Sequence, residues 1–504
     1  MSIEGTAGPD HGRVGPLGSP GSPKKGDLWG HPKGLYILFL TEMWERFSYY
    51  GMRALLVLYM TKYLFLPGHV EHVIAQDAIK SVIESVFGPQ SAQALSSQIY
   101  GLYTGFVYLT PVVGGIIADS VLGQRKTVIV GGVIMAIGHF VMAFSSLFYV
   151  ALLLLIIGNG LFKPNISTQV GALYPQGDPR RDGAFNIFYV GINLGAFLAA
   201  LVCGTLGESE RFGWHYGFGA AGVGMVLGLI LYVWGQKYLA PDNIMKRKLQ
   251  HKNEKGSGPA PVDAKPFGRE EWAKIAALVV LCLLNIPFWA VYEQQGNTLQ
   301  LWADGNTNRK IFELVGWGWE MPATWFQSVN PFFIAALTPF INVLWVRQAR
   351  KGTEPSSASK MAIGAFFLGF SYIVMIGGAR VFASGALASM WWLIGATFFA
   401  TVGELYLSPV GLSLVTKISP VRIVSMMMGI WFLSSFAGNY LSGYLGTFWE
   451  KMSKESFFIM MGGISFATGV LMVLCYYPLK KAIGDENAKA PGSDPPIPAV
   501  DAAA

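Results

Sequence analysis

The most informative stretch of this chain reads Thr41-Glu42-Met43-Trp44-Glu45-Arg46-Phe47-Ser48-Tyr49-Tyr50-Gly51-Met52-Arg53. It lies inside an apolar segment that runs from about residue 35 to residue 66. Ionisable groups are costly inside a bilayer unless they face one another or a water-filled path. At about 100° per residue, a helix would bring the polar side chains of this stretch onto one face, which makes that face a candidate functional site. The side chains on this face are Glu42, Glu45, Arg46, Tyr49, Tyr50 and Arg53.

The composition of the chain is that of a membrane protein. Of its 504 residues, 52% are hydrophobic and 13% are charged, whereas a soluble domain carries about 25% charged residues. Twelve apolar stretches approach or exceed the roughly 20 residues that a helix needs to cross a bilayer. They are 35–65, 97–118, 127–147, 149–171, 183–206, 214–236, 272–303, 323–346, 361–380, 386–416, 422–449 and 456–478. The loop after the first stretch is predicted to hold a short helix at 75–87.

Basic residues are distributed unevenly between the two sides of the predicted spans. Of the 37 Lys and Arg residues, 26 lie in the two tails and the loops that share their side, eight lie in the other loops and three lie within spans. The positive-inside rule therefore predicts a multi-pass protein with both termini in the cytoplasm. No basic stripe interleaves with aromatic residues, so we expect no nucleic acid as a partner and the lipid bilayer instead.

The longest basic loop divides the chain into two halves of six spans. The predicted parts are a disordered cytoplasmic N-tail at 1–33, a six-helix bundle at 34–236, a cytoplasmic linker at 237–271, a second six-helix bundle at 272–480 and a disordered cytoplasmic C-tail at 481–504. Two such halves are typical of the major facilitator architecture. The predicted fold is thus an all-α polytopic membrane protein of the major facilitator fold, with twelve transmembrane helices in two six-helix bundles.

A loop between the second and third spans supports this fold. It reads Gly115-Ile-Ile-Ala-Asp119-Ser-Val-Leu-Gly123-Gln-Arg125-Lys126 and resembles the superfamily's loop at the cytoplasmic gate. Asp119, Gly123 and Arg125 are its candidate gate residues, although topology alone could explain the basic ones.

Seven ionisable residues lie deep in the predicted spans, and their charges nearly balance. They are Glu42, Glu45, Arg46, Arg53, Lys163, Glu293 and Glu404. Four carboxylates against three cations leave one carboxylate unmatched, and desolvation with like-charged neighbours favours its protonated form. Glu404 has no cation on its own helix, so it needs a partner such as Lys163 or a substrate ammonium. A static ion cluster, or a lysine that reaches toward the helix end, is the alternative interpretation.

Signatures of soluble enzymes are absent from the sequence. It contains no H-E-x-x-H, no P-loop and no G-x-S-x-G motif. We therefore expect a protein that is not an enzyme, has no catalytic or metal-binding residues, and draws its energy from an ion gradient instead of from ATP.

Three motifs carry a family resemblance. They are Glu42-x-x-Glu45-Arg46-Phe47-x-Tyr49-Tyr50-Gly51, then Phe188-Tyr189-Val-Gly-Ile192-Asn193-Leu-Gly195, and Gly403-Glu404 followed by Ser408-Pro409-Val-Gly-Leu. With the segments around Lys163 and Glu293, they resemble motifs of the proton-coupled oligopeptide transporter family, in its bacterial form. The likeness extends from Tyr36 to about Tyr477.

The resemblance implies a symporter that imports di- and tripeptides with protons by alternating access, without a cofactor. It implies proton coupling by Glu42, Glu45 and Arg46, a peptide carboxylate site at Arg53 and Lys163, and a peptide N-terminus site at Glu404, Asn330 and Asn193. The pocket would include Tyr49, Tyr50, Tyr108, Trp289, Trp431 and Ser435, and a salt bridge between Arg53 and Glu293 would close the extracellular gate. We expect a monomer in the plasma (inner) membrane.

Two departures and several alternatives bear on this interpretation. The span 2 histidine of animal relatives is absent, because its position appears as Gly101 here. The linker is too short for the two extra helices of many bacterial relatives. The alternative function is a related proton-coupled carrier of nitrate or another small organic solute. A peptide-binding channel or receptor is the alternative from another class, and an embedded enzyme is the least favoured.

Overall fold

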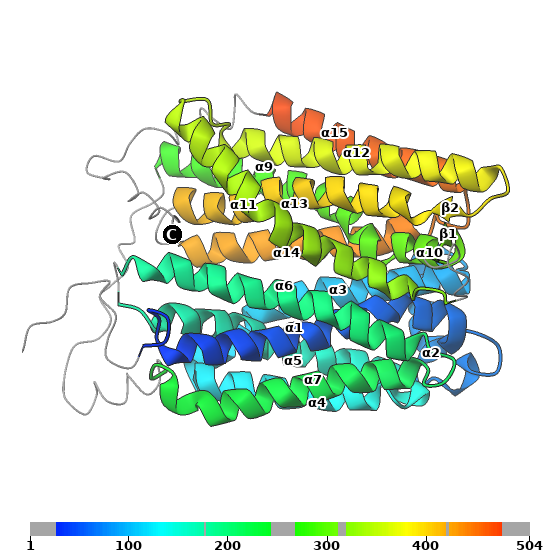
Figure 1. Ribbon diagram of the computed structural model, residues 1–504, viewed down its shortest axis with the longest axis horizontal. Coiled ribbons are helices and arrows are strands. Elements are labelled where there is room, and N and C mark those ends of the chain that lie inside the picture. Colours follow the sequence, from blue (N-terminus) through cyan, green and yellow to red (C-terminus); the bar gives the residue numbers. More distant parts are fainter. Residues whose placement is uncertain (1–26, 176–177, 243–267, 311–318, 420–422, 476–504) are drawn as a thin grey trace, which may run out of the picture.

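The computed structural model describes residues 27–175, 178–242, 268–310, 319–419 and 423–475. The long helices of the first half are α1 (Lys33–Tyr59), α3 (Ala92–Ile117), α4 (Gln124–Val141), α5 (Phe148–Ala172), α6 (Arg180–Gly207) and α7 (Trp214–Gly235). Those of the second half are α9 (Arg269–Tyr292), α11 (Val329–Arg350), α12 (Ser357–Ala383), α13 (Met390–Ile418), α14 (Val424–Gly446) and α15 (Lys454–Leu474). Figure 1 shows these helices running along one common axis.

Short elements lie between the long helices. Two are π-helical, η1 (Met60–Leu64) and η3 (Ala118–Leu122). The 3-10 turns are η2 (Val70–His72), η4 (Ser145–Leu147), η5 (Gln236–Tyr238), η6 (Glu293–Gly296) and η8 (Ala323–Ser328). Two short α-helices are α2 (Gln76–Phe87), close to its predicted bounds, and α10 (Thr298–Gly305). Two short strands, β1 (Thr307–Asn308) and β2 (Ala388–Ser389), pair in parallel.

The molecule has two distinct ends. At the end that we call the termini end, α1 begins at Lys33 and α15 ends at Leu474. At the opposite end, here the far end, lie α2, α10 and the strand pair (Figure 1). The predicted C-tail, residues 1–26 of the predicted N-tail and residues 243–267 of the predicted linker fall outside the described residues.

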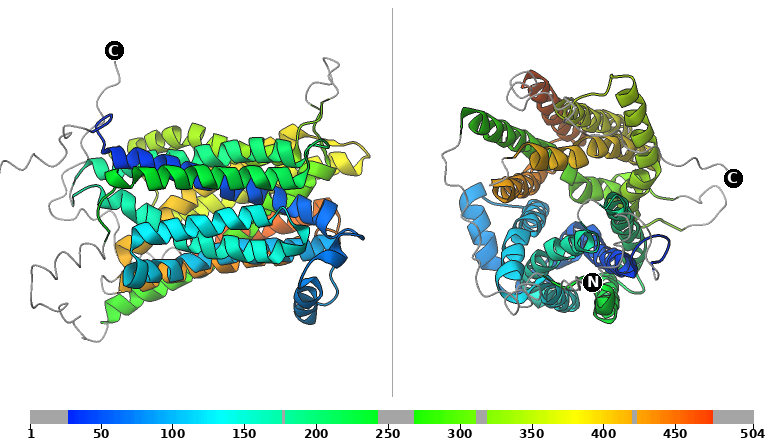
Figure 2. Two further views of the ribbon diagram at one scale, coloured as in Figure 1. Left: turned by 90° about the horizontal axis from the view of Figure 1, so that it is seen from below. Right: turned by 90° about the vertical axis from the view of Figure 1, so that its left-hand side faces the viewer.

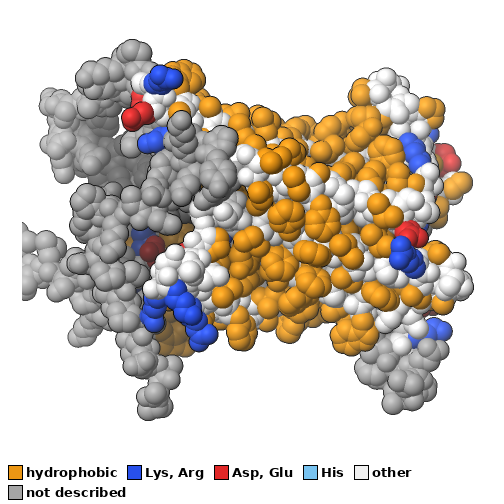
Figure 3. Space-filling model, turned by 90° about the horizontal axis from the view of Figure 1, so that it is seen from above, with side chains coloured by type: hydrophobic (Ala, Val, Ile, Leu, Met, Phe, Trp, Pro, Cys, Tyr) orange, Lys and Arg blue, Asp and Glu red, His pale blue; other side chains and the backbone are white. Residues whose placement is uncertain are grey.

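The surface is that of a multi-pass membrane protein. By length and apolar composition, nine helices among the described residues could cross a membrane. The three long helices α1, α4 and α14 complete the twelve of the predicted fold. Figure 3 shows hydrophobic side chains over the middle of one face and charged side chains near its two ends. Apolar side chains that would be costly in water therefore face the bilayer.

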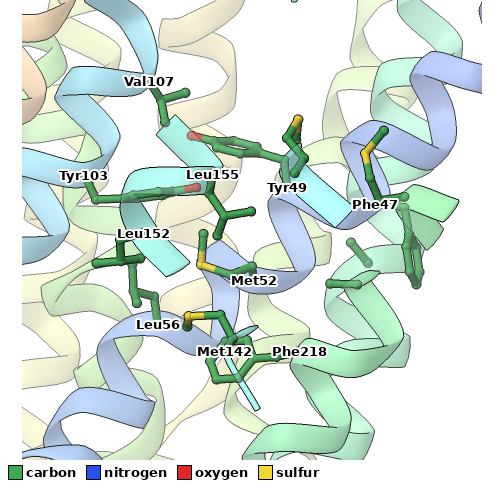
Figure 4. Packing of buried hydrophobic residues seen from close by; sticks show 14 of the residues in the cluster. Phe47, Tyr49, Met52, Leu56, Tyr103, Val107, Met142, Leu152, Leu155 and Phe218 are labelled. Carbon is green, nitrogen blue, oxygen red and sulfur yellow. The ribbon is translucent and has the colours of Figure 1, made fainter. Parts of the chain in front are cut away.

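Each half has a hydrophobic core of its own, and seen from the termini end the two bundles lie beside each other (Figure 2). In the first core, Met52 and Phe218 are fully buried, and Tyr103 packs beside Tyr49 (Figure 4). Between the bundles, α3 meets α14 where a Cβ on Gly101 would lie 2.7 Å from the Cα of Gly443. A histidine at Gly101 would therefore not fit in this conformation.

One predicted span is broken in the structure. The apolar stretch 272–303 forms α9, the turn η6 and the short helix α10, instead of one continuous helix. The break begins at Glu293, whose carboxylate bonds across to the other bundle. At Gly296 a Cβ would lie 1.9 Å from the hydroxyl oxygen of Tyr100, so a larger residue there would displace the Tyr100 ring.

The last residues of the predicted N-tail contact the first bundle. Arg180 at the start of α6 pairs with Asp27 at 3.0 Å and also donates to the carbonyl oxygen of Gly30. His31 bonds through Nδ1 to the hydroxyl of Tyr174 at 2.8 Å. Residues 27–31 are thus held against the connection between α5 and α6.

Candidate functional site

The first part of the site is a buried ion cluster on α1. Arg46 donates to Glu45 through both Nε and Nη2, and its Nε lies 3.1 Å from Oε1 of Glu42. All three side chains are at most 4% exposed. The i, i+4 spacing that the sequence predicts places Glu42 within reach of Arg46, whereas Glu45 is the adjacent residue and its contact with Arg46 does not follow from helical spacing.

A residue that the sequence analysis did not select completes this cluster. Asn159 on α5 donates from Nδ2 to Oε1 of Glu45 at 3.1 Å, and its side chain is fully buried. Asn159 lies four residues before Lys163, on the same face of α5. The Gly-Asn-Gly sequence around it was the available signal, because small neighbours let two helices approach closely.

Lys163 lies between this cluster and the central cavity. Its Nζ is 4.6 Å from the centre of the Tyr108 ring, a cation–π contact. Pro164 follows it inside α5. Lys163 does not line the cavity itself, although Tyr108 does. The lysine is thus directed at an aromatic ring on α3.

The second part of the site joins the two bundles. Arg53 on α1 donates from Nη2 to Oε2 of Glu293 and from Nε to the hydroxyl of Tyr100 at 2.7 Å. The Arg53 side chain is 13% exposed and that of Glu293 is 2% exposed. The pairing predicted between these two residues is therefore present, with Tyr100 as a partner that the sequence analysis missed.

The third part surrounds Glu404 on α13. Tyr292 donates its hydroxyl to Oε2 of Glu404, and Asn330 donates its amide to the same oxygen at 3.0 Å. Asn330 also donates to Thr401 at 3.0 Å. Neither is a cation, so in this conformation Glu404 is held by neutral donors and not by Lys163. Tyr292 was not predicted from the sequence.

A cavity of about 190 Å³ lies between the bundles and brings together most of the residues predicted to bind the peptide. Residues of the first bundle that line it include Tyr50, Arg53, Tyr108 and Asn193. Residues of the second bundle that line it include Trp289, Glu293, Asn330 and Glu404. The cavity therefore carries cationic and anionic groups in fixed positions, separated by aromatic walls.

Three residues predicted for the pocket do not line this cavity. Tyr49 is buried in the first core, with its ring 5.2 Å from the Arg46 guanidinium (Figure 4). Trp431 is 6% exposed and packs against Gly411, and Ser435 donates to the backbone of Trp431. All three side chains pack between helices. The sequence pattern does not show whether a helix face meets another helix or the cavity, so it could not separate these residues from those of the cavity.

The loop predicted at the gate lies at the termini end. Asp119 is in η3, and Gly123 has φ of +77°, a conformation that favours glycine. Arg125 donates from Nε to the carbonyl oxygen of Ala240 at 3.1 Å, and also to that of Leu239. The loop thus ties the start of α4 to the chain that follows α7.

Two six-helix bundles around a charged cavity define this molecule as a membrane carrier of the major facilitator type. The chain belongs to the POT family, whose model matches residues 125–255 and 263–463. This confirms the predicted family, and with it the prediction that the protein is a transporter and not an enzyme.

Individual relatives agree over nearly the whole chain. The chain is 34% identical to the "Uncharacterized transporter YclF" of Bacillus subtilis, over 92% of this chain and 96% of that protein. It is 32% identical to a "Di-/tripeptide transporter" of Lactococcus lactis subsp. cremoris, over 91% of this chain and 98% of that protein. A solved structure of the peptide transporter POT in complex with sulfate superposes with a TM-score of 0.75 at 32% identity, over 92% of this chain and 98% of that one.

Proposed function

We propose that this protein is a proton-coupled symporter that imports di- and tripeptides by alternating access. The observation that carries the proposal is the cavity, in which Arg53 stands at one wall and Glu404 at another. A short peptide is a zwitterion, with a carboxylate and an ammonium at its two ends. Arg53 lies on the first bundle and Glu404 on the second, while the other acidic residue of the lining, Glu293, is paired with Arg53, so the cavity matches that charge pattern.

In this proposal the peptide carboxylate is bound by Arg53 with help from Lys163. The ammonium is bound by Glu404, where it displaces Tyr292 or Asn330 from a carboxylate that has no cation in this conformation. Tyr50, Tyr108 and Trp289 supply walls for side chains, and Asn193 lies at the cavity edge. Trp431 and Ser435 would reach the peptide only after the helices rearrange.

Proton coupling is assigned to Glu42, Glu45 and Arg46. Protonation of either carboxylate removes one of the two negative charges beside Arg46 and weakens the cluster that Asn159 supports. Coupling requires that proton and peptide favour the same conformer. Arg53 with Glu293 would hold the far end closed until a peptide carboxylate competes for the guanidinium.

The proposal includes an orientation and an assembly state. The termini end faces the cytoplasm and the far end faces outside, in the inner membrane of a bacterium, with the carrier acting as a monomer. The distribution of Lys and Arg along the sequence supports this orientation.

Uptake of labelled di-alanine into liposomes tests the proposal. We expect accumulation above equilibrium under an inward proton gradient and none when the gradient is collapsed. Dipeptides with an acetylated N-terminus should compete poorly. If acetylated and free dipeptides compete equally well, the ammonium site fails and a carrier of another solute is favoured. Binding without accumulation would identify a receptor or channel.

Glu42→Gln and Glu45→Gln test the assignment of proton coupling. Each should abolish gradient-driven accumulation and leave counterflow exchange measurable, because exchange needs no net proton movement. Accumulation at the wild-type level in either variant would remove this cluster from the coupling mechanism.

A further inference from the structure

A further contact between the bundles lies at the far end, beside the cavity, which Ala196 and Ala200 of α6 and Gln327 of η8 help to line. We call it the α6–η8 seam, formed by Phe197, Gly204, Thr205 and Glu208 against Ala323, Thr324, Trp325 and Ser328. Gly204 leaves room for the Thr324 side chain, which any larger residue would strike. Ser328 donates to the carbonyl oxygen of Phe197 at 2.7 Å, and Trp325 donates from its indole to Thr205 at 2.9 Å.

One carboxylate holds the end of this seam. Glu208 follows α6 and accepts two hydrogen bonds from the other bundle, one through each oxygen. The backbone N–H of Ala323 lies 2.8 Å from Oε2, and that of Thr324 lies 2.8 Å from Oε1. These two N–H groups lie at the N-terminus of η8, which continues into α11. The negative charge of Glu208 therefore faces the positive end of the helix dipole.

Charged groups of both bundles surround Glu208. Arg309 of the second bundle lies 3.6 Å from Glu208 and 3.4 Å from Asp304. Lys62 of the first bundle pairs with Asp304 at 2.8 Å. The first bundle therefore supplies the anion Glu208 and the cation Lys62. The second bundle supplies their partners, Arg309 and Asp304. Glu320 also contacts Arg309, at 2.7 Å, but its side chain is 51% exposed, against 11% for Glu208.

We propose that Glu208 is a gating residue and that the α6–η8 seam is a second gate at the far end, separate from Arg53 and Glu293. The proposal rests on the alternating access of the proposed function, which requires the bundles to part at this end. Parting the seam takes the acceptor away from two backbone amides at once. Glu208 does not line the cavity, so a bound peptide cannot reach it directly. The seam then governs how readily the empty carrier opens outward.

Distances across the far end test this gate without any substrate. Spin labels are attached at Arg211→Cys and Leu387→Cys, exposed positions on opposite bundles, after Cys203, Cys282 and Cys475 are replaced by alanine. The full-length protein is reconstituted in lipid nanodiscs, and double electron–electron resonance gives the distance distribution. For Glu208→Gln we expect the long-distance population to rise at least fivefold, because the amide NH₂ cannot accept a bond from the second backbone N–H.

Two further variants make the test specific. Glu320→Gln also removes a negative charge beside Arg309, but it leaves the contacts of η8 intact. The long-distance population of this variant should stay within twofold of wild type. Trp325→Phe removes the bond to Thr205 without changing any charge, and it should also raise the long-distance population. If Glu208→Gln is not folded, Trp325→Phe decides the question alone. Wild-type distributions in every folded seam variant, or an equal effect of Glu320→Gln, would overturn the proposal.

The result is independent of the peptide assay. If distances change as expected but wild-type protein does not accumulate di-alanine, the peptide function fails and the gate remains. If di-alanine accumulates but the distances do not change, only the gate is withdrawn.

Discussion

Arg53 and Glu293 lie 240 residues apart in the sequence and form an ion pair that joins the two bundles beside the cavity. Arg53 simultaneously holds the hydroxyl of Tyr100. The same guanidinium therefore pairs with Glu293 of the other bundle and lines the cavity. A peptide carboxylate that binds Arg53 would compete directly with Glu293, which links substrate binding to the contact between bundles.

Removal of the Glu293 charge should stop transport. Glu293→Gln leaves Arg53 buried without a counter-charge, and an uncompensated buried charge costs about 3–5 kcal/mol. We expect the initial rate of gradient-driven uptake to fall by about 100-fold or more. Lys62→Gln breaks an ion pair whose lysine is 49% exposed, and such pairs contribute about 0–1 kcal/mol. An equal loss of uptake rate in both variants would show that breaking any ion pair between the bundles slows transport, and that the Arg53–Glu293 pair has no special role.

Asn159→Leu should weaken proton-driven uptake by about tenfold or more, because a hydrogen bond to a charged group contributes about 1.5–3 kcal/mol. The variant removes the amide that supports Glu45. Asn165→Leu is the matched control, since Asn165 is also buried on α5 but donates to the backbone oxygens of Gly114 and Leu161. The measurement is the ratio of accumulation to counterflow in each variant. A ratio that falls equally in both would assign Asn159 to helix packing.

Glu404→Gln should abolish the preference for a free N-terminus. Charge-assisted hydrogen bonds are about twice as strong as neutral ones, so we expect free dipeptides to lose about tenfold or more in affinity. Acetylated dipeptides should bind as before. Competition against labelled di-alanine in binding experiments with purified protein gives the dissociation constants of the free and the acetylated dipeptides. If the preference persists in Glu404→Gln, the ammonium is bound by another group.

Gly101→Ala should lower the melting temperature of the protein. The added Cβ would lie 2.7 Å from the Cα of Gly443 and 2.8 Å from the Asn439 carbonyl oxygen, and such overpacking costs about 1–3 kcal/mol. Gly115 lies on the same helix, and a Cβ added there would meet no atom within 4 Å. Gly115→Ala should therefore leave the melting temperature unchanged or raise it. Equal melting temperatures for the two variants would contradict the close contact of α3 and α14.

The contact of residues 27–31 should depend on pH. Burial and the Arg180 guanidinium lower the pKa of His31 below its ordinary value of 6.5. A lowered pKa means that the neutral imidazole is favoured when residues 27–31 contact the bundle, so the contribution of His31 to this contact is complete above pH 6.5 and is lost as the pH falls through the lowered pKa. Carbon-13 NMR of the histidine rings measures the midpoint. Arg180→Gln should raise it, and an unchanged midpoint would exclude Arg180 as a cause.

Local spacing and composition determined much of this protein from the sequence alone. The length of the apolar stretches predicts the twelve long helices, and the spacing of Glu42, Glu45 and Arg46 within two turns predicts their ion cluster. These features depend on neighbours along one helix, where geometry is fixed by the helical repeat. The resemblance to the POT family rests on this stretch together with the motifs at 188–195 and 403–412.

Only the tertiary structure decided which partners these residues have. Asn159 reaches Glu45 across 114 residues, and Tyr292 reaches Glu404 across 112. The break at Glu293 and the two hydrogen bonds of Glu208 likewise depend on a second bundle packed against the first. In a bilayer nearly every helix face is apolar, so the sequence pattern does not tell which faces meet. Close packing at glycines and buried hydrogen bonds make that choice, and they exist only once the helices are assembled.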